Sequence, residues 1–319
     1  MTRDSEKGVS SAQADAQASV QDGAVTGRHI FLGAAALIAE IALSFVIAIF
    51  VKKLQPSLSI FVILFFRYLF CLPLLFAYGI NQRGRHVLQV TNKPILVLRT
   101  LSGFLGLTTW FLAVSLIDLS LATALSQIMP FFITILAVLM LGEAVGVRRV
   151  AAVIIGFIGV MVLLGPTQIA NPGWGIIVGL SAPFFAALMF IFLRMLGKGE
   201  AAVSTALWYN MTGVVFAFGI THYLGNTFPT WESDISIWLM LIGIGVLASL
   251  QQLFMALSHT FAPASILAPV HYTAIPIGIF CGVFFFGEQI TLSLLIGTGI
   301  IFAANYYILM RERQLADNG

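Results

Sequence analysis

Two ionisable side chains lie in the middle of long apolar stretches, where a charged group is energetically costly. Glu40 is near the centre of the stretch 30–51, and Arg67 is near the centre of 58–79. A charged side chain at the centre of a membrane costs about 2.5–3.5 kcal/mol on insertion scales. Two interpretations stay open. Either Glu40 and Arg67 form a buried ion pair that fixes helix packing, or Glu40 binds a cationic or polar solute group or carries a coupling proton.

Arg99 lies about one helical turn inside the next apolar stretch, 94–116. Long basic side chains near a helix end can extend their charged group back to the membrane interface. The alternative is that Arg99 faces a cavity and meets an anionic or carbonyl group.

Other polar and aromatic side chains also fall within apolar stretches. Amide and imidazole groups in a membrane serve either as hydrogen-bonded links between helices or as solute contacts, and both interpretations are open for Gln251 and Asn305 as well. Indole rings away from the interface either pack against neighbours or form a wall for a flat heterocycle. The predicted solute contacts are Glu40, Arg67, Arg99, Trp110, Gln127, Trp208, Asn210, Gln252, His271 and Tyr272.

Other kinds of chemistry find little support in the sequence. Cys71 and Cys281 are isolated thiols in apolar stretches, which indicates neither a disulfide framework nor a metal site. The segment 197–200 lacks the spacing and the hydroxyl of an ATP-binding loop. We therefore predict no cofactor, no metal and no catalytic residue. A membrane-embedded enzyme is the alternative class, but it would need clustered His, Asp or Glu near one interface.

The composition of the chain indicates the kind of fold that must position these residues. Of 319 residues, 59% are hydrophobic and 9% are charged, against about 25% charged in a soluble domain. So few charges cannot cover a soluble surface, which excludes a soluble enzyme, a nucleic-acid-binding module and a disordered protein. The net charge of +3 does not indicate nucleic acid, because the basic residues are distributed by membrane side. The expected partners are a small-molecule solute and the lipid bilayer, with the chain a monomer or homodimer.

Apolar stretches long enough to cross about 30 Å of hydrocarbon recur along the chain, and helices satisfy their own backbone hydrogen bonds there. We therefore predict an all-α integral membrane fold. Residues 1–28 are polar, without a signal-peptide core, and are expected to form a disordered cytoplasmic tail. The ten predicted spans are 30–51, 58–79, 94–116, 119–141, 148–166, 173–194, 203–224, 235–258, 262–286 and 289–310.

Lys and Arg predict the orientation of these spans. Twelve basic residues fall on the side of the N-terminus, and two, Lys52 and Lys53, fall on the other. Basic loops remain on the cytoplasmic side. Both termini are therefore expected in the cytoplasm.

The two halves of the chain resemble each other. Residues 111–115 (FLAVS) match 254–258 (FMALS) at an offset of 143, and 141–143 (LGE) match 286–288 (FGE) at an offset of 145. Each unit then has five spans, so the second copy enters the membrane from the opposite side. The pattern predicts two inverted five-helix repeats, an architecture of secondary transporters that alternate access between two sides.

Several residues correspond through this repeat. Lys52 and Arg194 end the first and sixth spans at an offset of 142, and Tyr272 corresponds to Gln127. Glu143 and Glu288 close the fourth and ninth spans, and we interpret them as helix-end structural residues. Prolines, which remove a helical hydrogen bond and bend the helix, interrupt spans four, six and nine at Pro130, Pro183, Pro269 and Pro276.

One run of residues carries a family resemblance that covers about residues 30–310. It comprises 98–103 (LRTLSG), 110–113 (WFLA), Ala122, Pro130, 141–143, Arg148-Arg149 and 156–160 (GFIGV). The run resembles the EamA branch of the drug/metabolite transporter superfamily, in the subgroup with bacterial riboflavin and S-adenosylmethionine importers.

That resemblance implies EamA-like repeats at 29–168 and 169–311, followed by a cytoplasmic tail at 312–319. It also implies a secondary active or facilitative transporter, not an enzyme, in the bacterial inner membrane. Riboflavin uptake is the first expectation for the solute. S-adenosylmethionine uptake, or export of amino acids or metallophores, is the alternative.

Overall fold

The computed structural model describes residues 3–143, 146–170, 173–197, 201–230, 232–262 and 264–317. Side chains are described within 29–310, apart from those at the gaps and in 166–170, 264–266 and 268. The described residues form helices and connecting turns, with no strand among them. The helices are α1 (Arg3–Leu54), α2 (Ile60–Arg83), the 3-10 helix η1 (Gly84–His86), α3 (Lys93–Leu116), α4 (Leu119–Ser126), α5 (Met129–Leu141), α6 (Val147–Ala170), α7 (Trp174–Leu196), α8 (Ala202–Tyr223), α9 (Ile235–Phe261), α10 (Ala264–His271), α11 (Ala274–Phe286) and α12 (Leu292–Asp317).

Ten helical segments within the described residues are long and apolar enough to span a membrane. Their order and approximate bounds agree with the ten spans that hydropathy predicts, and the predicted all-α fold is confirmed. These segments are His29–Leu54, Ile60–His86, Lys93–Leu116, Leu119–Leu141, Val147–Gly165, Trp174–Leu196, Ala202–Tyr223, Ile235–Phe261, Pro269–Phe286 and Leu292–Met310.

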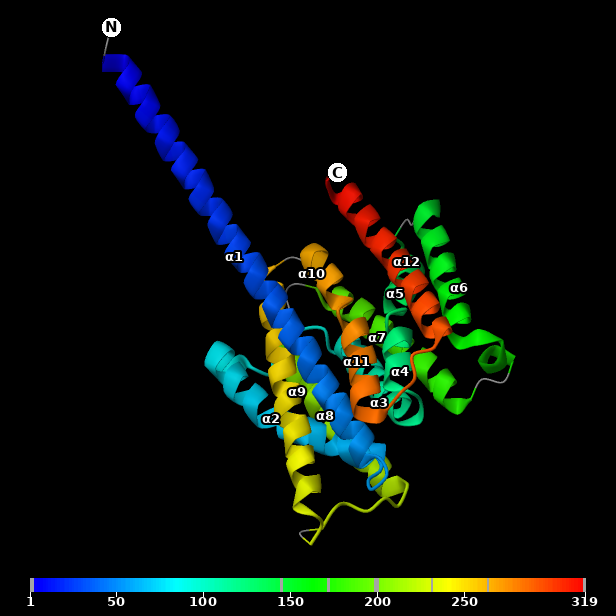
Figure 1. Ribbon diagram of the computed structural model, residues 1–319. Coiled ribbons are helices and arrows are strands. Elements are labelled where there is room, and N and C mark those ends of the chain that lie inside the picture. The colour runs from blue at the N-terminus through cyan, green and yellow to red at the C-terminus, as the bar shows by residue number, and fades with distance from the viewer. Residues whose placement is uncertain are drawn as a thin grey trace.

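The first helix is longer than its membrane span. Composition indicated a disordered tail over residues 1–28, whereas α1 is continuous from Arg3 and projects beyond the bundle (Figure 1). The segment contains no proline and several Ala and Gln residues, which have good helix propensity. Extension from an existing helix also avoids the cost of nucleating a new one.

Two spans are broken in the middle, and the breaks correspond through the repeat. The fourth span divides into α4 and α5, and the ninth divides into α10 and α11. The bounds of α10 and α11 equal those of α4 and α5 shifted by 145 positions. Gly142 and Gly287 end α5 and α11 in the same left-handed conformation, with φ of 67° and 65°. This agreement in length and cap extends the short matches found in the sequence to whole helices.

Proline explains why these spans break where they do. Pro130 lies at the start of α5 and Pro276 near the start of α11. Because proline has no N–H group to donate and its ring clashes with the preceding turn, it favours a break at these two positions. Proline alone does not force one, since α2 and α7 continue through Pro73 and Pro183. The bends expected at Pro130 and Pro276 are complete interruptions.

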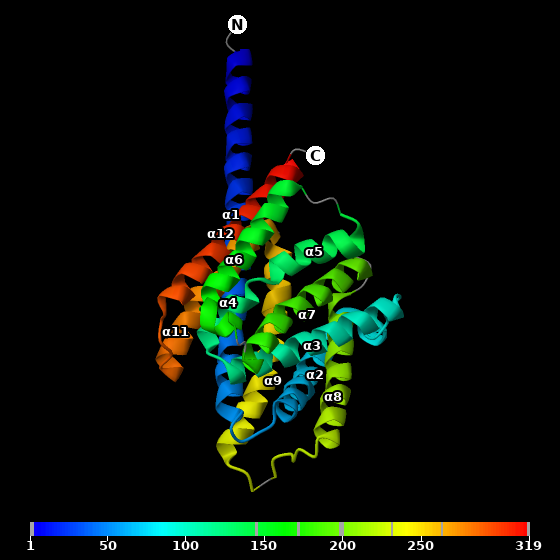
Figure 2. The same ribbon diagram turned by 90° about the vertical axis from the view of Figure 1, so that its right-hand side faces the viewer.

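Packing joins the two repeats. α1 lies against α9, and α3 lies against α7, two contacts that the repeat relates to each other. α2 packs on α8, and α6 runs beside α12 (Figure 2). At this last contact Gly297 approaches the backbone of Leu163, and a Cβ atom added there would come within 2.5 Å of it. A glycine is therefore required for the close approach of α6 and α12.

Candidate functional site

A cavity of about 590 Å³ lies among the helices of both repeats. Its size falls within the range of about 300–1,000 Å³ typical of sites for small organic ligands. Its wall is mostly apolar, with polar groups contributed by α1, α9 and the two broken spans. The principal polar and aromatic residues of the wall are Glu40, Ser44, Trp110, Thr123, Ser126, Gln127, Phe190, Gln251, His259, His271 and Tyr272.

Glu40 is the acidic side chain of this cavity. It is buried on α1 and accepts a hydrogen bond of 2.9 Å at Oε1 from Nε2 of Gln251 on α9. Within the described part of the chain, no Lys or Arg lines the cavity, and no ion pair joins Glu40 to Arg67. The Glu40–Arg67 ion pair, one of the two interpretations of these residues, is therefore not formed in the structure. The carboxylate is left facing the cavity with an uncharged amide as its partner.

The two broken spans bring Gln127, His271 and Tyr272 to the cavity. The break also frees the carbonyl of Gln127, because Phe131 donates its N–H to Ile128 instead. Asn305 on α12 satisfies that carbonyl through Nδ2 at 2.7 Å. Interrupted helices are tolerated in membranes where the freed backbone groups find such partners or line a cavity. Asn305 thus links α12 to the break in the fourth span, which is one of the two roles that the sequence left open for it.

Aromatic rings form much of the remaining wall. Trp110 on α3, Phe190 on α7 and Tyr272 at the break after α10 come from three separate parts of the bundle. Flat rings of this kind offer apolar faces on which a planar heterocycle can stack. The arrangement suits an organic solute with an aromatic ring.

Arg67 and Arg99 do not line the cavity. Arg67 lies beside the ring of Tyr68, with its Cζ 5.3 Å from the ring centroid, and among the described residues its Nε and Nη1 have no hydrogen-bond partner. Arg99 is buried, with its Cζ 5.3 Å from the ring centroid of Tyr209, and it donates through Nη1 to the carbonyl of Thr205 at 3.1 Å. Arg99 is therefore held between α3 and α8 and is not among the residues that line the cavity.

Trp208, Asn210 and Gln252 also face the core of α2, α3, α8 and α9 and not the cavity. Trp208 donates through Nε1 to the carbonyl of Leu88 at 2.9 Å. Asn210 donates to Gln252 at 3.3 Å, and Gln252 donates to Sγ of Cys71 at 3.1 Å. These contacts have the interhelical linking role that was the alternative interpretation of the amides.

Several polar residues of the wall were not among the predicted solute contacts, and His259 is the titratable one. The others are Ser44, Thr123, Ser126 and Gln251. His259 lies on α9 with Gln251 and Met255, which also line the cavity. Residues spaced by four share one face of a helix, so this spacing was the available signal. Of the two adjacent glutamines, Gln251 lines this cavity, whereas Gln252, the predicted solute contact, contacts Cys71.

Comparison with known proteins identifies the family of this chain. The profile of the EamA-like transporter family matches residues 31–165 and 173–310. The protein belongs to the EamA-like transporter family. The two matched segments together cover most of the chain, and each contains one five-helix repeat.

Curated relatives agree with this assignment. A riboflavin transporter of Brucella anthropi is 25% identical over 253 residues, which cover 79% of this chain and 88% of that protein. An S-adenosylmethionine uptake transporter of Rickettsia felis is 28% identical over 264 residues, with 82% and 87% covered. A protein known from a crystal structure shares the fold with a TM-score of 0.59 at 16% identity, covering 92% of this chain and 99% of that chain. The protein is thus a multi-pass membrane transporter of small metabolites.

Proposed function

We propose that this transporter takes up a cationic heterocyclic metabolite, with S-adenosylmethionine as the first candidate solute. The observation that carries the proposal is Glu40, a buried carboxylate that faces the cavity beside Gln251. A carboxylate in a low-dielectric site is stabilised by a positive charge brought close to it. S-adenosylmethionine supplies a sulfonium and an ammonium group, together with a planar adenine that can stack on the aromatic wall.

Riboflavin, the first expectation from the sequence, is the second candidate. The rings of Trp110, Phe190 and Tyr272 support it, as do the amides of Gln127 and Gln251, which can pair with the polar edge of a neutral isoalloxazine. Under this alternative Glu40 acts as a hydrogen-bonding group and not as a counter-ion. The chain would lie in the bacterial inner membrane with both termini in the cytoplasm. Energy would come from a gradient or from exchange.

Uptake of the two solutes by one preparation separates these candidates. We expect cells that express the protein to accumulate labelled S-adenosylmethionine, and Glu40→Gln to reduce that uptake at least about tenfold, because about 1.4 kcal/mol of lost attraction is a factor of ten. Accumulation of riboflavin alone, unchanged by Glu40→Gln, would reject the cationic solute. Accumulation of neither solute, at verified membrane expression, would reject both.

The adjacent glutamines of α9 provide a matched control. Gln251→Ala removes an amide from the cavity, whereas Gln252→Ala removes one from the neighbouring core. We expect the first variant to reduce uptake more than the second at equal expression. Equal effects would show that the cavity wall does not determine uptake.

A further inference from the structure

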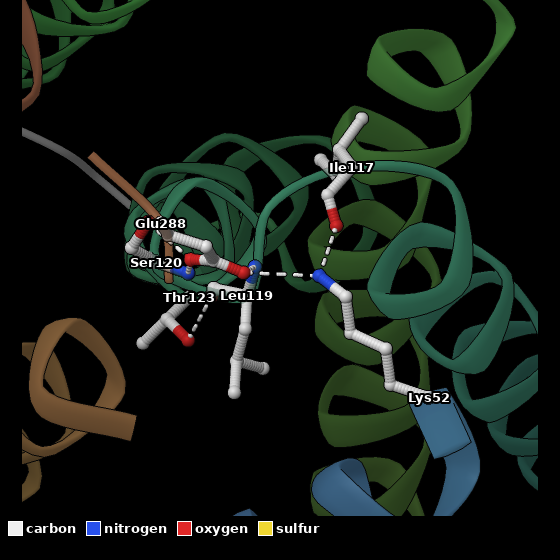
Figure 3. Close-up of polar contacts among 6 residues, drawn as sticks. All are labelled: Lys52, Ile117, Leu119, Ser120, Thr123 and Glu288. Atoms are coloured by element: carbon white, nitrogen blue, oxygen red, sulfur yellow. Dashed lines mark hydrogen bonds and ion pairs between the residues drawn. The ribbon is translucent and has the colours of Figure 1, made fainter. Parts of the chain in front are cut away.

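Glu288 holds three segments of the chain together at the end of the bundle that contains Lys52 (Figure 3). Its carboxylate accepts hydrogen bonds from the backbone N–H groups of Leu119 and Ser120, at 2.6 and 2.9 Å, and from the Ser120 hydroxyl at 2.7 Å. Lys52 donates to the same carboxylate at 3.0 Å and to the carbonyl of Ile117 at 3.1 Å. The Glu288 side chain is 4% exposed.

The contact with α4 is a helix cap supplied from the other repeat. Asp118 precedes α4 and is of a type that commonly caps helices, yet its side chain makes no capping hydrogen bond. Glu288 instead accepts from the first two N–H groups of α4, which have no partner within the helix and carry its partial positive charge. Hydrogen bonds to an ionised carboxylate are about twice as strong as neutral ones.

This cluster lies directly beyond the cavity. Thr123, one turn along α4 from Leu119, is part of the cavity wall. Gly278 on α11 packs so closely on it that an added Cβ would come within 2.7 Å of the Thr123 hydroxyl. One turn further along α11, Cys281 is buried in a cluster that includes Leu119. α4 and α11 therefore fill the space between the cavity and this end of the molecule.

The repeat relates this cluster to a second ion pair at the opposite end. Lys52 corresponds to Arg194, and Glu288 corresponds to Glu143. Arg194 forms a salt bridge with Glu143, with side chains 51% and 38% exposed. On this side of the cavity, the lining residue His259 is exposed. The two corresponding pairs thus differ: one is buried and capped, and the other is open to solvent.

We infer that Glu288 and Lys52 form a latch that closes one end of the solute pathway, and that Glu143 and Arg194 are its counterpart at the other end. The inference rests on the proposed transport function and names the device that would alternate access. With the latch formed, α11 stays on α4 and the Lys52 end is shut. When it opens, the two helices separate, and the Glu143–Arg194 pair, which is exposed in this structure, becomes buried and closes the other end.

Cys281 provides a native probe of this latch. In cells treated from outside with a membrane-impermeant methanethiosulfonate, we expect Cys281 to react slowly in the wild type and at least about tenfold faster in Glu288→Gln, because the weaker acceptor raises the open population. Mass spectrometry of the peptides distinguishes Cys281 from Cys71, which is fully buried in another cluster. Glu143→Gln is the matched variant, and it should not accelerate the reaction.

Three further variants serve as controls for the labelling experiment. Glu232→Cys places a thiol in the exposed loop at the Lys52 end and must react, which verifies that this end faces the reagent. Reaction of Cys71 in Glu288→Gln would reveal misfolding of that variant. In that case the labelling rate of Cys281 in Lys52→Met is the test of the latch. The double variant Glu143→Gln with Glu288→Gln should react more slowly than Glu288→Gln alone, because the Glu143–Arg194 pair is exposed in the closed state and would be buried, and so worth more, in the open state.

An unchanged rate at Cys281 in folded Glu288→Gln and in Lys52→Met would overturn the latch. Equal labelling rates of Cys281 in Glu288→Gln and in the double variant would overturn the role of Glu143. Neither measurement requires a transported solute. Failure of the uptake assay would therefore reject the proposed solute without affecting the labelling result.

Discussion

The two ends of this transporter carry the same pair of charges in different surroundings. At one end the carboxylate of Glu288 is buried and accepts hydrogen bonds from a helix terminus, a hydroxyl and Lys52. At the other end Arg194 is the ion-pair partner of a half-exposed Glu143 in the described part of the chain. The repeat supplies corresponding charged residues to both ends, and in this conformation the two pairs differ in burial. Corresponding residues of an inverted repeat can thus form the same kind of ion pair at both ends of the molecule, with different burial at each end.

The largest expected effect is on stability. Glu288→Ala leaves two N–H groups, a hydroxyl and a lysine without their acceptor, and removal of one partner of a buried pair typically costs about 3–5 kcal/mol. Glu143→Ala should cost at most about 1 kcal/mol, because its pair is exposed. Thermal unfolding in detergent measures both variants, and similar changes in Tm would contradict the contrast between the two ends.

A smaller difference is expected when the charges of each pair are exchanged. Lys52→Glu with Glu288→Lys should not restore the wild-type Tm, because the new lysine would face N–H donors and the positive end of α4. Arg194→Glu with Glu143→Arg should come close to the wild-type Tm, since that end requires opposite charges and no cap. The same detergent assay tests both exchanges, and recovery at both ends would reduce Glu288 to a simple ion-pair partner.

The smallest expected effect is that of pH on the latch. Burial raises the pKa of Glu288, but the donated hydrogen bonds of Ser120 and Leu119, together with Lys52, outweigh it and hold this pKa below its ordinary value. A group whose pKa is lowered on folding stabilises the fold above its unfolded pKa and loses that contribution as the pH falls through the folded value. The Tm difference between the wild type and Glu288→Gln should therefore be constant from about pH 8 to about pH 5 and disappear below the ordinary glutamate pKa of about 4.3. A difference that declines steadily above pH 5 would contradict this.

The sequence predicted the fold more fully than the site. Spans follow from the hydropathy of windows of about 20 residues, and the short matches around Gly142 and Gly287 were enough to reveal the repeat. The sequence predicted only bends in the two spans that are interrupted. The position of a proline shows where a helical hydrogen bond is lost, but not which group replaces it. At Gln127 the replacement is Asn305, which is 178 positions away.

For the site, the sequence identified polar residues within the membrane but could not determine which way each one faces. Gln251 and Gln252 are neighbours in the chain and point about 100° apart on the helix, so one meets the cavity and the other meets Cys71. Glu40 and Arg67 lie at similar depths in adjacent spans, yet the structure leaves them unpaired. Depth follows from position along a span, whereas facing depends on how every helix is rotated against its neighbours.

The amino-acid sequence by itself therefore determined the membrane class, the number of spans and the inverted repeat, because hydropathy and internal similarity are properties of the chain in one dimension. Only the tertiary structure decided that Glu40 faces a cavity with an amide partner and that Glu288 caps a helix 168 positions earlier in the chain. Both depend on packing between helices that are distant in sequence. The physical reason is that a buried carboxylate takes whatever donors the folded bundle brings within hydrogen-bond distance.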